Sequence, residues 1–445
     1  MEAGMRTKRL SAVATALLTV TLAATGCGGS GSPGTPAASG QAASSAPAGP
    51  VTLTYWTWVP NMDKIVAVWN QANPDIKVTV SKQAGGDDAS AKFLTAAKAG
   101  NPPDLVQAEY QHLPSFVAAE AVADISAETA SVRGEFTPQL WNLVTLGTEG
   151  VYAVPQDSGP MMLYYRPDLF EKYGIEVPKT WDEYAKAART VRGKDPKVYL
   201  GTFSSKDPGS FAGLAQQAGA QWWAINGEAW KVGIDDAATL KVADYWGGLV
   251  REGAIDDMPY FTPAWNKALN DGTLLSWPSA VWGPGVLEAN APKGKGKWAI
   301  APLPQWSAGE NASGFWGGSS TAVAEKSPNR AAAVRFATWL NTDPQALRLL
   351  IDEGAVYPAS TKGQSAITQP PAYFSSQPDF WTKAAEVAAT ARGFTFGPNV
   401  NVTYNAFKDA FDKALRDKAP FGDAVRVMQE TTVADMRKSG FQLAQ

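Results

Sequence analysis

The sequence predicts an α/β protein built from two domains, and two observations support this fold class. Short runs rich in β-branched and aromatic residues alternate with amphipathic helical runs from about residue 51 onward. The chain has 445 residues, of which 45% are hydrophobic, and a single hydrophobic core rarely organises so long a chain. We therefore expect strands and helices to alternate within each of two domains.

The first domain is expected to begin with three strands separated by two helices. The expected elements are a strand over Val51–Val59, a helix over Asn61–Asn73 that ends before Pro74, a strand over Ile76–Val80, a helix over Ala89–Ala99 and a short strand over Asp104–Gln107. This β-α-β-α-β order predicts a parallel sheet, in which ligand-binding groups follow the carboxyl ends of the strands.

A second domain is expected to begin after Val151–Pro155, around Met161–Tyr165. Its expected elements include helices over Trp181–Arg192, Ala237–Arg251 and Trp265–Asn270, and an extended run over Trp298–Leu303 that leads back toward the first domain. Near the C-terminus Phe407, Phe411 and Leu415 recur at a spacing of four, which predicts an amphipathic helix.

The N-terminus carries an export signal. Basic residues precede an uncharged stretch, Leu10–Gly26, which is short for a bilayer span and typical of a signal peptide. It ends before Cys27, the only cysteine, and the small residues before it resemble the lipobox of bacterial lipoproteins. In that motif the signal peptide is cut before the cysteine, whose sulfur carries a lipid; the alternative is a plain secreted protein. We expect a signal peptide over 1–26 and a disordered Gly/Ser/Ala/Pro tether over 27–50.

Composition excludes several classes of function. One cysteine forbids an internal disulfide, and with a single histidine (His112) the chain lacks the residues for an ordinary His/Cys zinc site. The formal net charge is −3 and no long basic run occurs, so we expect no nucleic-acid partner. We also expect no metal and no cofactor.

Aromatic residues are the positive signal, with 17 Trp in the chain. Many fall in segments expected to be strand ends or loops, near short polar side chains. These aromatics are Tyr55, Trp56, Trp58, Tyr110, Trp222, Trp223, Trp277, Trp282, Trp306 and Trp316, and the polar residues are Gln107, Glu109, Gln156, Asp157 and Ser158. A sugar ring stacks its C–H face on an aromatic ring and needs planar donors and acceptors around its rim, so this combination suits a sugar site. Tryptophans in the helical runs are expected to be core residues.

Two other chemistries use some of the same residues. Glu109 and Asp157 could form the acid/base pair of a glycoside hydrolase, which needs about 5–9.5 Å between the carboxyl groups. Tyr164 and Tyr165 could bind ferric iron as tyrosinates, although adjacent residues of a strand point to opposite faces, which favours packing.

Several stretches together carry a resemblance to a known family. They are Leu53–Trp56, Pro103–Tyr110, Val151–Pro160 continuing into Leu163–Phe170, Pro178–Tyr184, Trp298–Pro304 and Gly317–Val323. With the export signal and the tether, the chain resembles the extracellular solute-binding lipoproteins of bacterial ABC sugar importers, the maltodextrin-binding-like family 1, of the actinobacterial type.

The resemblance implies a two-lobed periplasmic-binding-protein-like α/β fold with a hinge and an interlobe cleft. Lobe 1 would comprise residues 51–157 and about 305–365, and lobe 2 residues 158–304 and about 366–445. The resemblance implies these ligand-binding residues: Trp56, Trp58, Gln107, Glu109, Tyr110, Asp157, Trp282, Trp316, Gly317 and Gly318, with Tyr357 and the 399–404 stretch as weaker candidates.

The expected function is capture of a sugar or oligosaccharide and its delivery to ABC permease subunits, without catalysis. The protein would be a monomer, anchored through Cys27 at the extracellular face of the cytoplasmic membrane. The alternatives are a surface-anchored glycoside hydrolase and a binding protein of the same fold for a peptide, polyamine or ferric ion.

Overall fold

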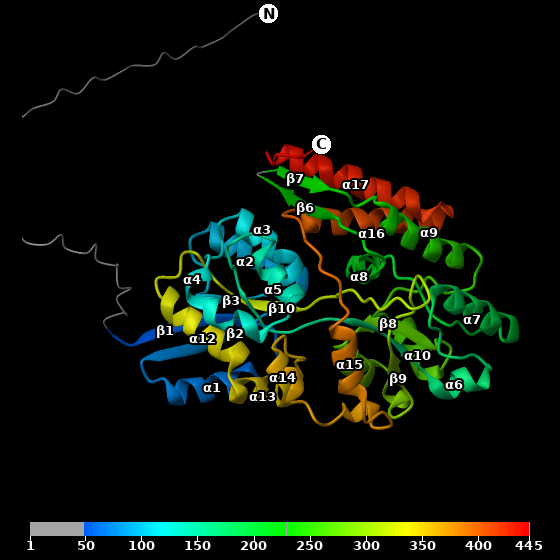
Figure 1. Cartoon of the computed structure of the whole chain (residues 1–445), viewed down its shortest axis with the longest axis horizontal. Coiled ribbons are helices and arrows are strands. Elements are labelled where there is room, and N and C mark those ends of the chain that lie inside the picture. The colour runs from blue at the N-terminus through cyan, green and yellow to red at the C-terminus, as the bar shows by residue number, and fades with distance from the viewer. Residues whose placement is uncertain (1–48, 228, 445) are drawn as a thin grey trace, which may run out of the picture. The chain divides into compact units, whose positions relative to one another are not determined.

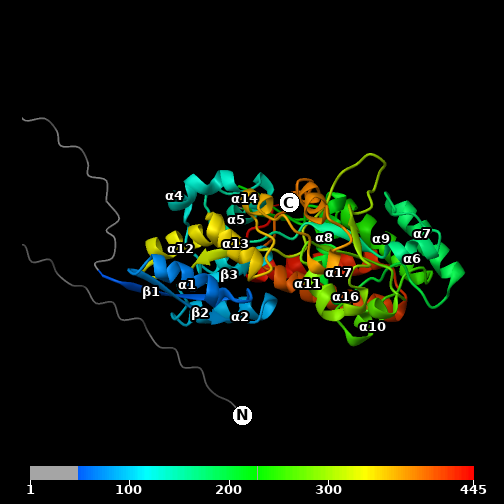
Figure 2. The ribbon, with the colours of Figure 1, turned by 90° about the horizontal axis from the view of Figure 1, so that it is seen from below.

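The computed structural model describes residues 49–227 and 229–444. Cys27 and the expected signal peptide lie outside these residues. The described part contains a five-stranded sheet, a three-stranded sheet and a two-stranded hairpin. In Figure 1, β1, β2, β3 and β10 of the five-stranded sheet lie in one group and β8 and β9 of the three-stranded sheet in another, and Figure 2 shows β1, β2 and β3 together at one end.

The first sheet has the strand order β2-β1-β3-β10-β4. Its strands are β1 (Val51–Thr57), β2 (Ile76–Lys82), β3 (Leu105–Glu109), β4 (Val154–Pro155) and β10 (Ser319–Val323). The pairs β1–β2 and β1–β3 are parallel, as predicted, whereas β10 runs antiparallel to both β3 and β4. The parallel arrangement predicted from the first three strands is therefore confirmed for those strands, and the antiparallel β10, which returns from the second sheet and enters between β3 and β4, was not predicted.

Helices close in sequence to these strands pack around them. They are α1 (Met62–Ala72), α2 (Gly86–Lys98), α3 (Leu113–Ala118), α4 (Ser126–Thr129), α5 (Pro138–Thr145), α12 (Arg330–Thr342), α13 (Pro344–Asp352) and α14 (Thr361–Ser365), with 3₁₀ turns at Tyr110–His112 and Ala130–Glu135. In α1, Ile65, Val66 and Trp69 form the buried apolar face. Their spacing is the pattern from which this helix was predicted.

The second sheet has the order β8-β5-β9 and is antiparallel throughout. Its strands are β5 (Met161–Tyr165), β8 (Ser276–Ala280) and β9 (Ala299–Ala301), and the separate hairpin consists of β6 (Trp223–Asn226) and β7 (Ala229–Val232). The accompanying helices are α6 (Pro167–Lys172), α7 (Trp181–Lys194), α8 (Pro208–Ala218), α9 (Ala237–Arg251), α10 (Pro263–Asp271), α11 (Gly283–Asn290), α15 (Phe380–Ala388), α16 (Val400–Asp417) and α17 (Phe421–Lys438), with 3₁₀ turns at Pro292–Gly294 and Ala372–Phe374.

Two segments that connect the sheets lie side by side. The first crossing segment (residues 156–160) leads from β4 to β5, and the second crossing segment (residues 302–318) leads from β9 to β10. The Trp316 amide donates to the Gly159 carbonyl at 2.8 Å, and the Met161 amide donates to the Gly314 carbonyl at 2.9 Å. These backbone hydrogen bonds fix the two crossings against each other between the sheets.

Candidate functional site

A partly open cavity of about 550 Å³ lies where the crossing segments meet. Its lining includes Trp58, Gln107, Glu109, Gln111, Asp157, Ser158, Lys206, Asp207, Gly209, Trp282, Phe315, Trp316, Gly317, Gly318, Ser319, Tyr357, Phe396, Tyr404 and Lys408. These residues come from the carboxyl ends of β1 and β3, from both crossing segments and the start of β10, from the starts of α8 and α11, from α16, and from the segments that follow α13 and α15. The volume falls in the range of small-molecule sites.

The wall formed by the first sheet is a hydrogen-bonded chain of polar side chains. Gln107 accepts from the Thr57 hydroxyl at 2.7 Å and from the Trp58 amide at 3.1 Å. Its side-chain nitrogen donates to Ser319 Oγ at 2.9 Å, and this hydroxyl donates in turn to Asp157 Oδ2 at 2.6 Å. This series of hydrogen bonds, called the Gln107 chain below, fixes the Asp157 carboxylate and the Gln107 amide at the cavity wall before any ligand binds.

Asp157 has an unusual environment for a carboxyl group. Its Oδ1 accepts from the Ser319 backbone amide at 2.6 Å. Burial raises the pKa of Asp157 to about 6, the hydrogen bonds from Ser319 oppose that rise, and the negative charge of Glu109 adds to it. Glu109 itself accepts from the Gln111 side-chain amide at 2.6 Å.

The raised pKa of Asp157 predicts a pH dependence of folding stability. Because an unfolded Asp titrates near pH 4, the folded chain holds a proton between about pH 4 and 6 that the unfolded chain has released. The contribution of Asp157 to stability is therefore full below about pH 4 and is lost as the pH rises through about 6. Urea midpoints of the wild type should fall across this range relative to those of Asp157→Asn; parallel profiles would contradict the assignment.

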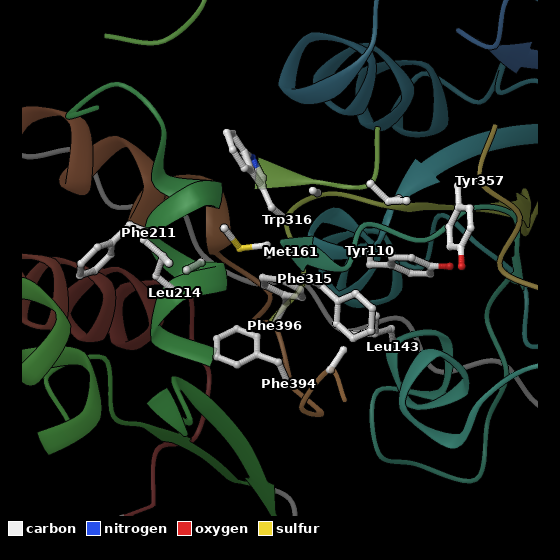
Figure 3. Close-up of a cluster of buried hydrophobic side chains, with 14 of the residues drawn as sticks. Tyr110, Leu143, Met161, Phe211, Leu214, Phe315, Trp316, Tyr357, Phe394 and Phe396 are labelled. Atoms are coloured by element: carbon white, nitrogen blue, oxygen red, sulfur yellow. The ribbon is translucent and has the colours of Figure 1, made fainter. Parts of the chain in front are cut away.

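The aromatic wall is formed mainly by Trp316 and Trp282. Their rings meet edge to face with centroids 4.8 Å apart, and the Trp282 indole N–H donates to the Trp316 carbonyl at 2.9 Å. A Cβ on Gly209, near the start of α8, would lie 2.9 Å from the Trp316 ring. The glycine thus allows the Trp316 ring to lie close to the backbone at the start of α8. Figure 3 shows Trp316 in the same cluster as Phe315 and Met161.

Two glycines after Trp316 are required by geometry. Gly317 and Gly318 have φ of 73° and 96°, a region that L-residues with a Cβ rarely adopt. A Cβ on Gly318 would lie 2.9 Å from the Tyr110 ring. These glycines let the second crossing segment turn into β10 beneath the cavity.

The opposite wall comes from α8 and α16. Lys206 forms an ion pair with Asp412 of α16, and Asp412 also accepts from the Ser205 hydroxyl at 2.5 Å. Asp207 caps α8 by accepting from the Ser210 amide at 3.2 Å. The contacts of Asp412 with Ser205 and Lys206 join residues about 200 positions apart in sequence. They add charged groups to the wall opposite the Gln107 chain.

Eight of the ten expected ligand-binding residues line this cavity: Trp58, Gln107, Glu109, Asp157, Trp282, Trp316, Gly317 and Gly318. Trp56 and Tyr110 are not among the lining residues. Trp56 is half-buried beneath the Lys92 ammonium, 4.7 Å from the ring centroid. Tyr110 is buried and donates its hydroxyl to the Asp157 carbonyl at 2.8 Å, so it supports the wall from behind.

Of the weaker candidates, Tyr357 and Tyr404 of the 399–404 stretch line the cavity. Sequence reasoning missed the rest of the wall formed by α8 and α16. Lys206, Asp207, Gly209 and Lys408 were not candidates, although the start of α8 could have been recognised from Asp207 followed by Pro208. Trp222, Trp223 and Trp277, which the sequence grouped with the aromatics suited to a sugar site, are fully buried in the core and do not line the cavity. Tyr164 is also buried, and its hydroxyl donates to the Ala280 carbonyl at 2.8 Å.

Within residues 49–227 and 229–444, no cluster of three or more His, Cys, Asp or Glu side chains is arranged to hold a metal ion. Over the same ranges, no helix combines the length and the apolar character needed to span a bilayer.

Comparison with known proteins decides the family. The family model for the bacterial extracellular solute-binding protein matches residues 55–347, which cover both crossing segments and most of the cavity lining. The chain belongs to this family. The fold is accordingly the two-lobed periplasmic-binding-protein-like fold, with the cavity at the junction of the lobes.

Several relatives of this solute-binding protein carry names that refer to sugars, and others are named for sn-glycerol-3-phosphate. It is 24% identical over 314 residues to an arabinooligosaccharide-binding protein of Halalkalibacterium halodurans, covering 67% of this chain and 69% of the relative. It is 26% identical over 425 residues to a lactose-binding protein of Rhizobium radiobacter, covering 88% and 94%. The galacto-N-biose/lacto-N-biose I-binding protein of an ABC transporter from Bifidobacterium longum, solved with lacto-N-biose, superposes with a TM-score of 0.80 at 26% identity, covering 89% of this chain and 99% of that one.

Proposed function

We propose that this protein is the extracellular sugar-binding component of an ABC importer, which captures a sugar or oligosaccharide in the cavity and delivers it to membrane permease subunits. The cavity itself carries the proposal. Trp58, Trp282 and Trp316 offer aromatic surface, and Gln107, Glu109 and Asp157 offer an amide and two carboxyl groups. The names of the relatives add support, since they refer to arabinooligosaccharide, lactose and lacto-N-biose.

Capture follows from the placement of groups in two lobes. We take lobe 1 as residues 51–157 and about 305–365, and lobe 2 as 158–304 and about 366–445, so the crossing segments act as the hinge. A sugar that contacts both walls stabilises the closed arrangement only by its additional affinity for that arrangement. The closed form is the one proposed to dock on the permease, and the chain requires no ATP, metal or cofactor of its own for capture.

Asp157 and Glu109 are also the residues of the alternative function, glycoside hydrolysis, which needs one carboxyl group with a raised pKa, as Asp157 has. Both oxygens of Asp157 already accept hydrogen bonds from Ser319, so this group is held as a fixed acceptor. That arrangement favours binding of the ligand over protonation of a glycosidic oxygen.

A thermal-shift screen with analysis of the recovered ligand tests the proposed function. Lacto-N-biose, lactose and arabinooligosaccharides should be compared with peptides, polyamines and ferric ion. A sugar at 100 times its dissociation constant adds about 2.7 kcal/mol of stability, and chromatography should recover it unchanged. Cleaved sugar would establish a hydrolase. Stabilisation by another solute and by no sugar would keep the fold and refute the substrate class.

We also propose that Cys27 carries the lipid that anchors the protein to the outer face of the membrane, with residues 27–50 as a tether. Cys27→Ser should therefore shift the protein from the membrane fraction to the medium, because one sulfur is the only proposed attachment point. Immunoblotting of fractionated cells measures this, with Ser30→Ala as the matched control. Retention of Cys27→Ser in membranes at the wild-type level would contradict the anchor.

A further inference from the structure

The loop before α10 holds an exposed aromatic side chain between two anchored residues. Phe261 is 47% exposed, whereas Tyr260 is buried. The Tyr260 hydroxyl donates to the Thr202 carbonyl at 3.1 Å. On the other side, Thr262 caps α10 by accepting from the Trp265 amide at 3.3 Å. The position of Phe261 is therefore fixed from both sides, although its own side chain extends toward solvent.

The backbone of Phe261 is strained. Its φ is 60°, and a bulky residue with a Cβ adopts this left-handed region only where the surrounding structure requires it. Glycine would adopt the same conformation at lower cost. Among the described residues, Ile225 and Val427 are exposed to a similar degree, but neither has a positive φ. An aromatic side chain that is both exposed and strained indicates that the ring itself has a function.

The Phe261 ring lies beside the aromatic wall of the cavity. Its centroid is 6.3 Å from that of Trp316, with the planes at 48°. On its inner side it contacts the buried rings of Trp265 and Trp277, at centroid distances of 5.5 and 6.1 Å. Trp316 and Trp282 line the cavity and Phe261 does not. The exposed part of Phe261 therefore continues their aromatic surface beyond the cavity.

The cavity and this ring together suit a ligand longer than the cavity. The cavity is partly open and measures about 550 Å³, so a long sugar chain projects from it. A sugar unit that projects past Trp316 meets Phe261 next and packs its C–H face against the ring. A phenyl ring makes no directional hydrogen bonds, so it responds to the presence of a further sugar unit rather than to the pattern of its hydroxyl groups.

We propose that Phe261 is a specificity-determining residue for chain length, which packs against a sugar unit that projects beyond the cavity. This inference rests on the proposed function and narrows the substrate class to oligosaccharides with at least one unit outside the cavity. Because the neighbouring residues fix the backbone of Phe261, the ring is in place before the ligand binds, and little conformational freedom is lost on binding.

Two variants of Phe261 separate the aromatic ring from its apolar packing. Phe261→Leu keeps an apolar side chain against Trp265 and Trp277 but removes the flat ring, and Phe261→Tyr keeps the ring. Val427→Ala is the control, because Val427 is 45% exposed on α17 and lies outside the cavity lining. The full chain of each variant should be titrated calorimetrically with arabinooligosaccharides of increasing length, lactose and lacto-N-biose, and its ligand-free unfolding temperature should be measured.

The proposal predicts that the affinity of the wild type rises with the number of sugar units. Phe261→Leu should weaken binding of the longer sugars by about three- to tenfold, the effect of one lost aromatic contact, and leave the affinity for the shortest bound sugar unchanged. Phe261→Tyr and Val427→Ala should match the wild type at every length.

Three results would overturn this inference alone. They are a wild-type affinity that does not rise with length, binding of disaccharides but of no longer sugar, and an effect of Phe261→Leu that is absent or equal for short and long sugars. Failure of the wild type to bind any sugar would overturn the proposed function and this inference with it.

Discussion

Trp58→Ala is expected to weaken sugar binding by about 30- to 150-fold, because losing the apolar contact of one aromatic ring costs about 2–3 kcal/mol. Trp58 is half-buried and lines the cavity. Its ring lies over Gly85, where a Cβ would sit 3.4 Å from its Cγ. Since few contacts within the core are lost, the unfolding temperature of the ligand-free variant should stay near that of the wild type. Titration calorimetry and thermal unfolding measure the two effects.

Trp56→Ala is the control for this prediction. Trp56 is also half-buried, two residues earlier in the chain, but it lies outside the cavity lining and packs against the core beneath Lys92. It should lose stability and keep its affinity. Equal loss of affinity in Trp56→Ala and Trp58→Ala would show that the effect comes from β1 as a whole and would refute a direct role for Trp58.

Trp246→Ala should destabilise the protein by about 3–5 kcal/mol, the usual cost of removing a large buried aromatic side chain. Trp246 is 1% exposed and contacts Trp181 and Tyr184 at centroid distances of 5.5 and 5.8 Å. Urea unfolding measures the loss. Trp230→Ala, on the edge hairpin and only partly buried, should cost far less, and equal costs for the two variants would contradict the assignment of Trp246 to the core.

The tryptophans serve mainly as core residues, and Trp246 is one of them. From the sequence, the 17 Trp indicated a sugar site, yet most of the tryptophans are buried and three line the cavity. Sequence pattern identified Trp69, Trp181 and Trp246 as core residues because they lie on helical stripes. It failed for Trp222 and Trp223, since burial of a loop or strand-end residue depends on which distant segments cover it.

The parts of the fold that depend on residues close together in sequence were predictable. The alternation of β1, α1, β2, α2 and β3 follows from residue patterns within about 60 positions, and these elements lie close to their expected bounds. The antiparallel entry of β10 was not predictable from such patterns, because it depends on a pairing with β3 across about 210 residues. The direction of a returning strand is fixed by where the preceding segment crosses.

The same distinction applies to the cavity. Gln107, Glu109 and Trp58 follow strand ends of a local β-α-β unit, so their convergence could be expected. The ion pair of Lys206 with Asp412 joins α8 to α16, and no local pattern predicts that contact. Ser158 and Tyr357 likewise become neighbours only through backbone pairing between distant segments.

Titration calorimetry of the full chain with lacto-N-biose, lactose and arabinooligosaccharides tests the central claim most directly, with Trp58→Ala measured in parallel. The proposed function predicts that at least one sugar binds with a stoichiometry of one per chain and that Trp58→Ala weakens this binding by about 30-fold or more. Absence of binding by any sugar at millimolar concentration, or sugar binding that Trp58→Ala leaves unchanged, would contradict capture of a sugar in this cavity.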